Sequence, residues 1–367
     1  MNRSNNSEKQ ATGALKAPTL TDVAEAAGVS YATADRVVNE RGNVALKSKL
    51  KVQDALSALG YVRNVAAANL SRQRKYHLAF LLPGGRNAFF NRMRAHVNAA
   101  AARLAADQVY IDIIDIDAFA IKGLKRSLSE LDSARYDGIA VVGLQAQEIV
   151  RPLRNLNDAG TVILGLVSDL PAEYRAAYIG IDNEAAGRTA ARLAGLAHGG
   201  NSGQIQLIAG SLSAVDHSQR LKGFVDVIES DFPSINCIDP LMTKDRASAV
   251  EEAVESVLRQ GSTVTALYNA GAGNAGLIAA LRSRNTKSRP VCVVHELVPH
   301  TLAGLHDKQI DVVIDQRPDI EANRAIALMK DLIDGREPLP TQALVPTIYL
   351  HDNVPPDIQG TTLGIDK

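Results

Sequence analysis

The chain has 367 residues, 46% of them hydrophobic, and its 40 Lys and Arg are balanced by 40 Asp and Glu. This length can bury a large core and predicts more than one domain. The two cysteines fit no metal-ligand spacing and predict reduced thiols. No stretch reaches the ~20 apolar residues of a membrane span, and the polar residues 1–17 lack the apolar run of a secretion signal. We therefore expect a cytoplasmic protein with a disordered leader and no membrane partner.

Residues 19–39 predict two short helices joined by a tight turn. Thr19 and Asp22 have the spacing of a capping box at the start of the first helix. Gly28 supplies the left-handed turn that glycine takes at little cost, and Ser30 can cap the second helix. The pattern favours a DNA-reading helix-turn-helix over an ordinary helical hairpin. Four side chains are left on the outer face of the second helix: Tyr31, Ala32, Thr33 and Arg36.

A third helix is predicted over residues 46–59, with Gly60 ending it. Charge is unevenly distributed along the chain. The first 75 residues carry 12 Lys and Arg against 6 Asp and Glu, whereas the remainder has an excess of acidic residues. A basic head on an acidic body is typical of a protein that binds a polyanion at one end.

Residues 19–39 strongly resemble the helix-turn-helix of the LacI-type repressor family, and residues 61–71 look like its hinge helix. In that family the hinge helix orders on DNA and inserts a leucine between base pairs of the minor groove. Leu70 occupies that position. The alternative is a helical linker with one stray leucine. The resemblance implies a set of DNA contacts: Tyr31, Ala32, Thr33, Arg36, Asn39, Asn64, Ala67 and Leu70.

The head departs from the family pattern at three positions. Asp35 stands where serine is usual, and we expect it to support Arg36 through a paired geometry. Ala45 replaces a capping serine, so the third helix is expected to begin without a side-chain cap. Arg63 replaces a proline, which adds a phosphate contact but removes a rigid turn.

From residue 77 onward, short apolar runs alternate with amphipathic stretches. The runs predict strands over residues 78–82, 110–116, 139–142, 162–167, 204–209, 264–268 and 291–294. Helices are predicted between them, among others over residues 89–106, 184–196 and 247–259. This alternation predicts parallel sheets covered by helices on both faces, and its length suggests two Rossmann-like lobes with a cleft at the carboxyl ends of the strands.

The body resembles the type I periplasmic sugar-binding-protein fold that the LacI-type family uses as its effector domain. A sugar offers hydroxyls to carboxylates and amides, and its CH face can lie on an aromatic ring. The resemblance implies an effector site made of Asn87, Phe89, Phe90, Asp182, Arg220, Asn269, Glu296 and Gln316. Taken singly, the strand-end polar residues could be helix caps and the phenylalanines core residues. His295 and Glu296 replace a usual aromatic and aspartate, which leaves neutral, positively charged and acidic sugar derivatives open.

Residues 271–276, GAGNAG, match the GxGxxG pattern of dinucleotide-binding proteins. Their place deep in the second lobe favours a tight turn into a helix instead. The sequence offers no recognisable serine-histidine-acid set, and His217, His295 and His300 are not spaced as a metal site. We therefore expect no cofactor, no metal and no catalytic residue, and no enzymatic activity.

Together these observations predict a small all-α helix-turn-helix head on an α/β body of two Rossmann-like lobes. The expected segments are a leader (1–17), the head (18–62), a hinge helix and linker (63–76), the two-lobed effector and dimerisation domain (77–350) and a tail (351–367). The predicted function is a homodimeric transcriptional regulator, most simply a repressor, that binds a pseudo-palindromic double-stranded DNA operator under the control of a small carbohydrate effector. Alternatives are control by a protein corepressor or a non-sugar metabolite, a solute-capturing binding protein, and a nucleotide-binding enzyme.

Overall fold

The computed structural model describes residues 18–38, 44–61, 74–85, 87–117, 120–259, 264–283, 289–336 and 343–354. The chain divides into two compact units, Met1–Arg74 and Lys75–Lys367. Within the described ranges, no helix combines the length and the apolar character that crossing a bilayer requires.

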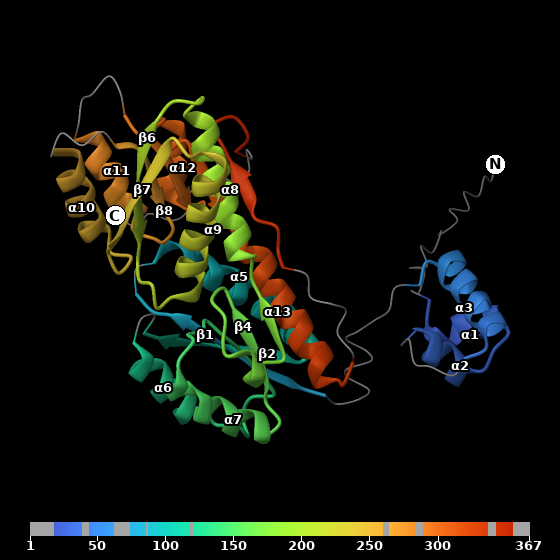
Figure 1. Cartoon of the computed structure of the whole chain (residues 1–367). Helices are drawn as coiled ribbons and strands as arrows, with labels where there is room; N and C mark the ends of the chain where they lie inside the picture. The colour runs from blue at the N-terminus through green and yellow to red at the C-terminus, as the bar shows by residue number, and fades with distance from the viewer. Residues whose placement is uncertain are drawn as a thin grey trace, which may run out of the picture. The chain divides into compact units, whose positions relative to one another are not determined.

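The first unit contains three helices, α1 (Leu20–Ala27), α2 (Tyr31–Val38) and α3 (Leu46–Leu59) (Figure 1). The capping box is confirmed: Thr19 N donates to Asp22 Oδ2 at 2.6 Å, and Asp22 N donates to Thr19 Oγ1 at 3.3 Å. Gly28 and Gly60 end α1 and α3 in the left-handed conformation, with φ of 63° and 60°. As expected, α3 begins without a side-chain cap, because Ala45 occupies the cap position before Leu46. The helices enclose a small core of Val23, Ala24, Ala27, Ala34, Val37, Val52 and Ala55.

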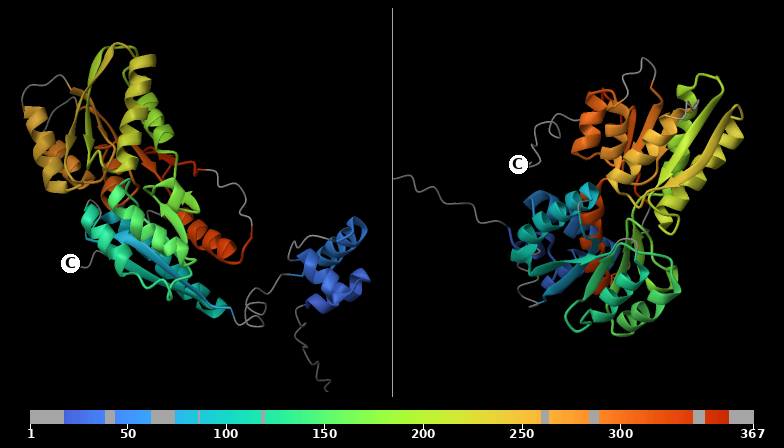
Figure 2. Two further views of the ribbon diagram at one scale, coloured as in Figure 1. Left: turned by 60° about the horizontal axis from the view of Figure 1, so that its bottom comes forward. Right: turned by 90° about the vertical axis from the view of Figure 1, so that its left-hand side faces the viewer.

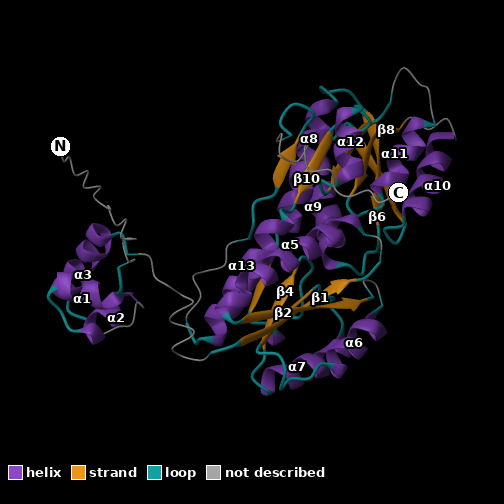
Figure 3. Ribbon diagram, turned by 180° about the vertical axis from the view of Figure 1, so that it is seen from behind, coloured by secondary structure: helices purple, strands orange, loops and turns teal. Residues whose placement is uncertain are grey.

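The second unit is built on two sheets, each lying among helices (Figures 2 and 3). The first sheet has the order β2-β1-β3-β4-β5 and is parallel throughout. Its strands are β1 (Tyr76–Pro83), β2 (Val109–Ile116), β3 (Gly138–Val141), β4 (Val162–Leu166) and β5 (Ala177–Ile179). The second sheet has the order β11-β10-β9-β8-β6-β7, and only β11 runs antiparallel to its neighbour. Its strands are β6 (Gly203–Ala209), β7 (Ile235–Met242), β8 (Val264–Asn269), β9 (Val291–His295), β10 (Val312–Asp315) and β11 (Thr347–Tyr349).

Helices complete the two lobes. The first lobe holds α5 (Ala88–Leu104), α6 (Ile121–Glu130), α7 (Val150–Asp158), α13 (Pro318–Ile333) and the short 3-10 helices η1 (Ala105–Asp107), η2 (Gln147–Ile149) and η3 (Ala172–Tyr174). The second lobe holds α8 (Asn183–Ala197), α9 (Val215–Asp231), α10 (Ala247–Arg259), α11 (Asn274–Arg282) and α12 (Pro299–His306). The predicted two-lobed α/β body is thus confirmed.

The chain crosses between the lobes more than once. It enters the second lobe between β5 and α8, and it returns after β10, because α13 packs Ala322, Ile326 and Met329 into the core of the first lobe. Figure 2 shows this red helix against the first lobe's strands. A bridge between Ile181 and Leu344 places the last crossing beside the first. Side chains at the strand ends therefore meet from both lobes.

Candidate functional site: a cleft between the two lobes

A cavity lies where the strand ends of the two lobes face each other. Its inner part, of about 60 Å³, shares Asn87, Phe89, Phe90, Asp245 and Glu296 with an outer part of about 920 Å³. The polar side chains that line the inner part are Asn87, Ser168, Asp216, His217, Arg220, Asp245, Glu296 and Gln316.

Arg220 reaches the cavity from α9 and is 2% exposed. Its Nε donates to Asn183 Oδ1 at 2.8 Å and its Nη1 donates to the carbonyl of Ala270 at 2.9 Å, while Nη2 has no protein partner. Glycines bring α8 and α9 close enough for these bonds: a Cβ on Gly187 would lie 2.0 Å from the Arg220 carbonyl oxygen, and one on Gly223 would lie 2.1 Å from a carbonyl of α8. The guanidinium is therefore held in place and keeps one donor for another molecule.

Glu296 and Gln316 come from the ends of β9 and β10. Gln316 Nε2 donates to Glu296 Oε1 at 2.5 Å, and the second oxygen of each side chain, Glu296 Oε2 and Gln316 Oε1, has no protein partner. Burial, and then the nearby Asp315 carboxylate, raises the pKa of Glu296 to about 8. Asp315 itself accepts bonds from Arg92 at 2.9 Å and from Leu297 N at 3.0 Å.

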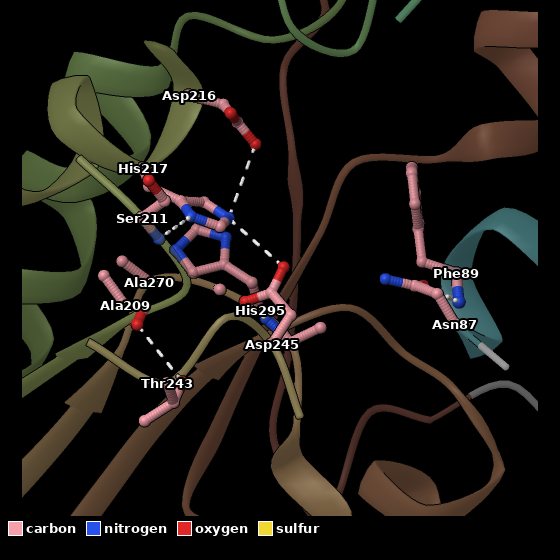
Figure 4. Close-up of polar contacts among 12 residues, drawn as sticks. Asn87, Phe89, Ala209, Ser211, Asp216, His217, Thr243, Asp245, Ala270 and His295 are labelled. Atoms are coloured by element: carbon pink, nitrogen blue, oxygen red, sulfur yellow. Dashed lines mark hydrogen bonds and ion pairs between the residues drawn. The ribbon is translucent and has the colours of Figure 1, made fainter. Parts of the chain in front are cut away.

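His217 lies between two carboxylates at the cavity wall (Figure 4). Its Nε2 is 3.7 Å from Asp216 Oδ2 and 3.8 Å from Asp245 Oδ2, and its Nδ1 accepts from Ser211 N at 3.4 Å. Asp245 has a φ of 57° and accepts from Ala272 N at 3.0 Å. Such a strained backbone recurs where a ligand is held.

Two glycines make room for this group. A Cβ on Gly210 or on Gly271 would lie 2.3 or 2.4 Å from Asp245 Oδ1. Asp216 and Asp245 were not predicted from the sequence, and His217 was considered there only as a metal ligand and set aside. In the described part of the chain, three His, Cys, Asp or Glu residues nowhere converge as a metal site would require.

Asn87, Phe89 and Phe90 form the first-lobe wall of the cavity. Asn87 Oδ1 caps α5 by accepting from Phe89 N at 3.0 Å and Phe90 N at 3.3 Å. The two rings meet edge to face at 5.0 Å and 73°. Figure 4 shows Asn87 and Phe89 across the open space from Asp245 and His217. An apolar wall thus faces a charged one.

Two predicted effector residues do not line the cavity. Asp182 is exposed, caps α8 by accepting from Ala185 N at 2.8 Å, and lies 3.8 Å from Arg188. Asn269 is fully buried and turned away, because it accepts from Gly271 N at 3.1 Å and donates to Asn274 Oδ1 at 2.7 Å. Both side chains bond to backbone N–H groups of the following turn. This is the capping role that the sequence left open as the alternative for strand-end polar residues.

The GAGNAG segment is a turn into α11. Gly273 has a φ of 86° at the start of this helix, and a Cβ on Gly276 would lie 1.8 Å from the Ala247 carbonyl oxygen. These glycines allow the turn and the close packing of α10 on α11.

The outer face of α2 carries the predicted DNA contacts of the head. Tyr31 is 56% exposed, and Ala32 and Arg36 are exposed as well. Thr33 is half-buried, with its hydroxyl 2.9 Å from Ser30 Oγ, so it supports the start of α2. The other predicted contacts, Asn39, Asn64, Ala67 and Leu70, lie outside the described residues.

Comparison with known proteins agrees with this architecture. Residues 19–64 match the bacterial regulatory proteins of the lacI family, and residues 78–337 match the periplasmic binding protein domain. The HTH-type transcriptional regulator DegA of Bacillus subtilis is 28% identical over 68% of this chain and 73% of its own length. The lactose operon repressor of Escherichia coli is 29% identical over 57% of this chain, and the match spans 56% of the repressor.

Solved structures share the fold of the second unit. A solute-binding protein from Burkholderia graminis, solved with D-arabinose, has a TM-score of 0.69 and 24% identity over 76% of this chain and 96% of that one. GanP, a glucose-galactose binding protein from Geobacillus stearothermophilus, has a TM-score of 0.68 and 21% identity over 77% of this chain and 99% of its own. The head, the two-lobed body and these matches lead to one conclusion: the chain belongs to the lacI family of DNA-binding transcriptional regulators.

Proposed function

We propose that this protein is a repressor whose affinity for operator DNA is set by a small, hydroxyl-rich solute bound between its lobes. One observation carries the solute part of the proposal. Buried side-chain atoms without a protein partner gather in residues that line the cleft: Ser168 Oγ, Arg220 Nη2, Glu296 Oε2 and Gln316 Oε1.

A buried polar atom without a partner costs about 1–3 kcal/mol, so a group of them at one cavity indicates a molecule that binds there. Hydroxyls fit the set because each both donates and accepts. Phe89 and Phe90 offer an apolar surface for the CH face of a ring. The solved relatives with D-arabinose and with a glucose-galactose specificity support a sugar or sugar-like solute.

The DNA part of the proposal rests on α2. Tyr31, Ala32 and Arg36 would read base edges in the major groove, with Thr33 holding the helix start. We also propose a homodimer, a DNA contact from Asn39, and a tether over residues 63–76 whose Asn64, Ala67 and Leu70 meet the minor groove. A regulator of this kind works in the cytoplasm, where the DNA is.

The test uses the full chain and two variants. Arg36→Ala should weaken binding to the cognate operator by about 1–3 kcal/mol, with little effect on random DNA, and should keep stabilisation by solute. Arg220→Ala should keep operator binding and lose the response to solute. Gel-shift titration and thermal-shift assays with a sugar and polyol panel measure both. Equal loss on both DNAs for Arg36→Ala, or an unchanged solute response for Arg220→Ala, would contradict the proposal.

A further inference from the structure

The inner part of the cleft holds more carboxyl groups than cations to pair with them. Asp216, Asp245 and Glu296 line the inner cavity, whereas Arg220 is the guanidinium among its described lining residues. Arg220 gives its bonds to neutral oxygens of Asn183 and Ala270 rather than to a carboxylate. The charge of the carboxyls is therefore not offset by a salt bridge to this arginine.

A further carboxyl group without a cationic partner lies behind the cavity. Glu321 on α13 is fully buried, and neither of its carboxyl oxygens has a protein partner. Asp315 is the exception, because it pairs with Arg92 at 2.9 Å. Burial, followed by the charges of Glu296 and Asp315, raises the pKa of Glu321 well above its usual value. The pKa of Glu296 is raised by burial and then by the charge of Asp315. Protons thus compensate part of the acidic excess.

We propose that the effector is a cation, a small hydroxylated solute with a protonated amine whose ammonium group lies between the Asp216 and Asp245 carboxylates, with Glu296 offering a further oxygen. This inference rests on the proposed function and narrows its solute class. A separate observation is Gln316 Oε1, which has no protein partner and belongs to a residue more than nine-tenths buried that lines the same cavity, beside the unpartnered Glu296 Oε2.

The geometry suits an ammonium. The distances of 3.7 and 3.8 Å from His217 Nε2 to Asp216 and Asp245 exceed hydrogen-bond length, so these carboxylates can still accept from a bound donor. An ammonium has three donors, no acceptor and a compact shape, which fits an inner volume of about 60 Å³. Arg220 Nη2 supplies a donor for a hydroxyl oxygen, so the solute carries both kinds of group.

The first test compares matched amines and neutral compounds on the full chain. D-glucosamine, D-galactosamine and D-mannosamine are each titrated beside the parent hexose and the N-acetyl derivative, by thermal shift and calorimetry. We expect an amine to bind at least about tenfold tighter than both neutral partners, because close charge pairs in a desolvated site contribute this much. Tighter or equal binding of a neutral hexose would overturn the cation and leave the proposed function standing. Failure of the operator response to every solute would count against both.

The second test needs no solute. Asp216→Asn removes one charge while keeping the shape, so it should raise the thermal midpoint of the protein by relieving repulsion within the cleft. Asp226→Asn on the same helix is the matched control, since Asp226 pairs with Lys222 at 2.9 Å on the exposed side. Its midpoint should stay unchanged or fall slightly. A midpoint for Asp216→Asn at or below that of the control would overturn the inference, whatever the amines do.

Discussion

Arg220 and Asn183 are joined by a 2.8 Å hydrogen bond between the guanidinium Nε and the amide Oδ1. Asn183 is the first residue of α8, directly after the chain enters the second lobe. Its Nδ2 donates to Tyr178 Oη at 3.4 Å, and that hydroxyl donates to the Val167 carbonyl at 2.7 Å at the end of a first-lobe strand. A line of hydrogen bonds therefore links the arginine of the cleft to the opposite lobe through the crossing between the lobes.

Asn183→Ala should destabilise the protein by about 1–3 kcal/mol, because the buried guanidinium loses the acceptor of its Nε. Urea unfolding of the full chain measures the change. Asn157→Ala, at an exposed position on α7, is the control and should stay within about 0.5 kcal/mol of the parent. Equal urea midpoints for the two variants would show that another acceptor replaces Asn183 as the partner of the Arg220 Nε.

The fold was predictable where the sequence is strongly periodic. The buried strands of the sheet centres, such as β1 and β8, are short apolar runs, and α3 and α10 have the predicted bounds. Four strands were missed for physical reasons. β5 and β11 are three residues long, and β10 is four. β7 is an edge strand whose INCIDPLM sequence contains Asp239 and Pro240, residues that an interior strand excludes.

The cleft was predictable in part. Arg220, Glu296 and Gln316 followed from the family resemblance, and their roles stay predictions. Asp216 and His217 precede Arg220 by one turn of α9, so helical spacing could have placed them on the same face. Asp245 could not be placed, because its direction depends on left-handed backbone at two successive non-glycine residues, φ 52° at Lys244 and 57° at Asp245.

Thr19→Ala should destabilise the head by about 1 kcal/mol, since the variant loses the hydroxyl that accepts from Asp22 N. Hydrogen exchange of the α1 amides in the full chain measures this locally. Ser57→Ala is the control, because the exposed Ser57 hydroxyl only returns a bond to the Gln53 carbonyl within α3. Unchanged exchange in α1 would show that packing alone fixes the start of this helix.

Stability should fall as pH rises from about 4.5 to about 8. The folded-state pKa of Glu296 is raised to about 8, above the unfolded value of 4.5, so its contribution is present below the unfolded pKa and is lost as pH rises through the folded one. Glu321, raised as well, adds to the slope. Glu296→Gln keeps the acceptor for Gln316 and should flatten the curve, whereas the exposed Glu148→Gln should run parallel to the parent. Urea unfolding across this pH range measures the dependence of stability on pH. If Glu296→Gln left that dependence unaltered, a group other than Glu296 would be responsible for it.

Gly187→Ala should destabilise the protein by about 3 kcal/mol or more. Alanine gains up to about 1 kcal/mol over glycine in a helix interior, but here the new Cβ would lie 2.0 Å from the Arg220 carbonyl oxygen, and backbone has to move. Separation of α8 from α9 would also withdraw Arg220 from the cleft, so the response to solute should weaken along with stability. Leu196→Ala, at a 64% exposed position on the same helix, should change neither by a measurable amount. Urea unfolding measures the stability of both variants, and solute titration measures their response. If Gly187→Ala lost stability but kept the full solute response, Arg220 would be positioned from α9 alone.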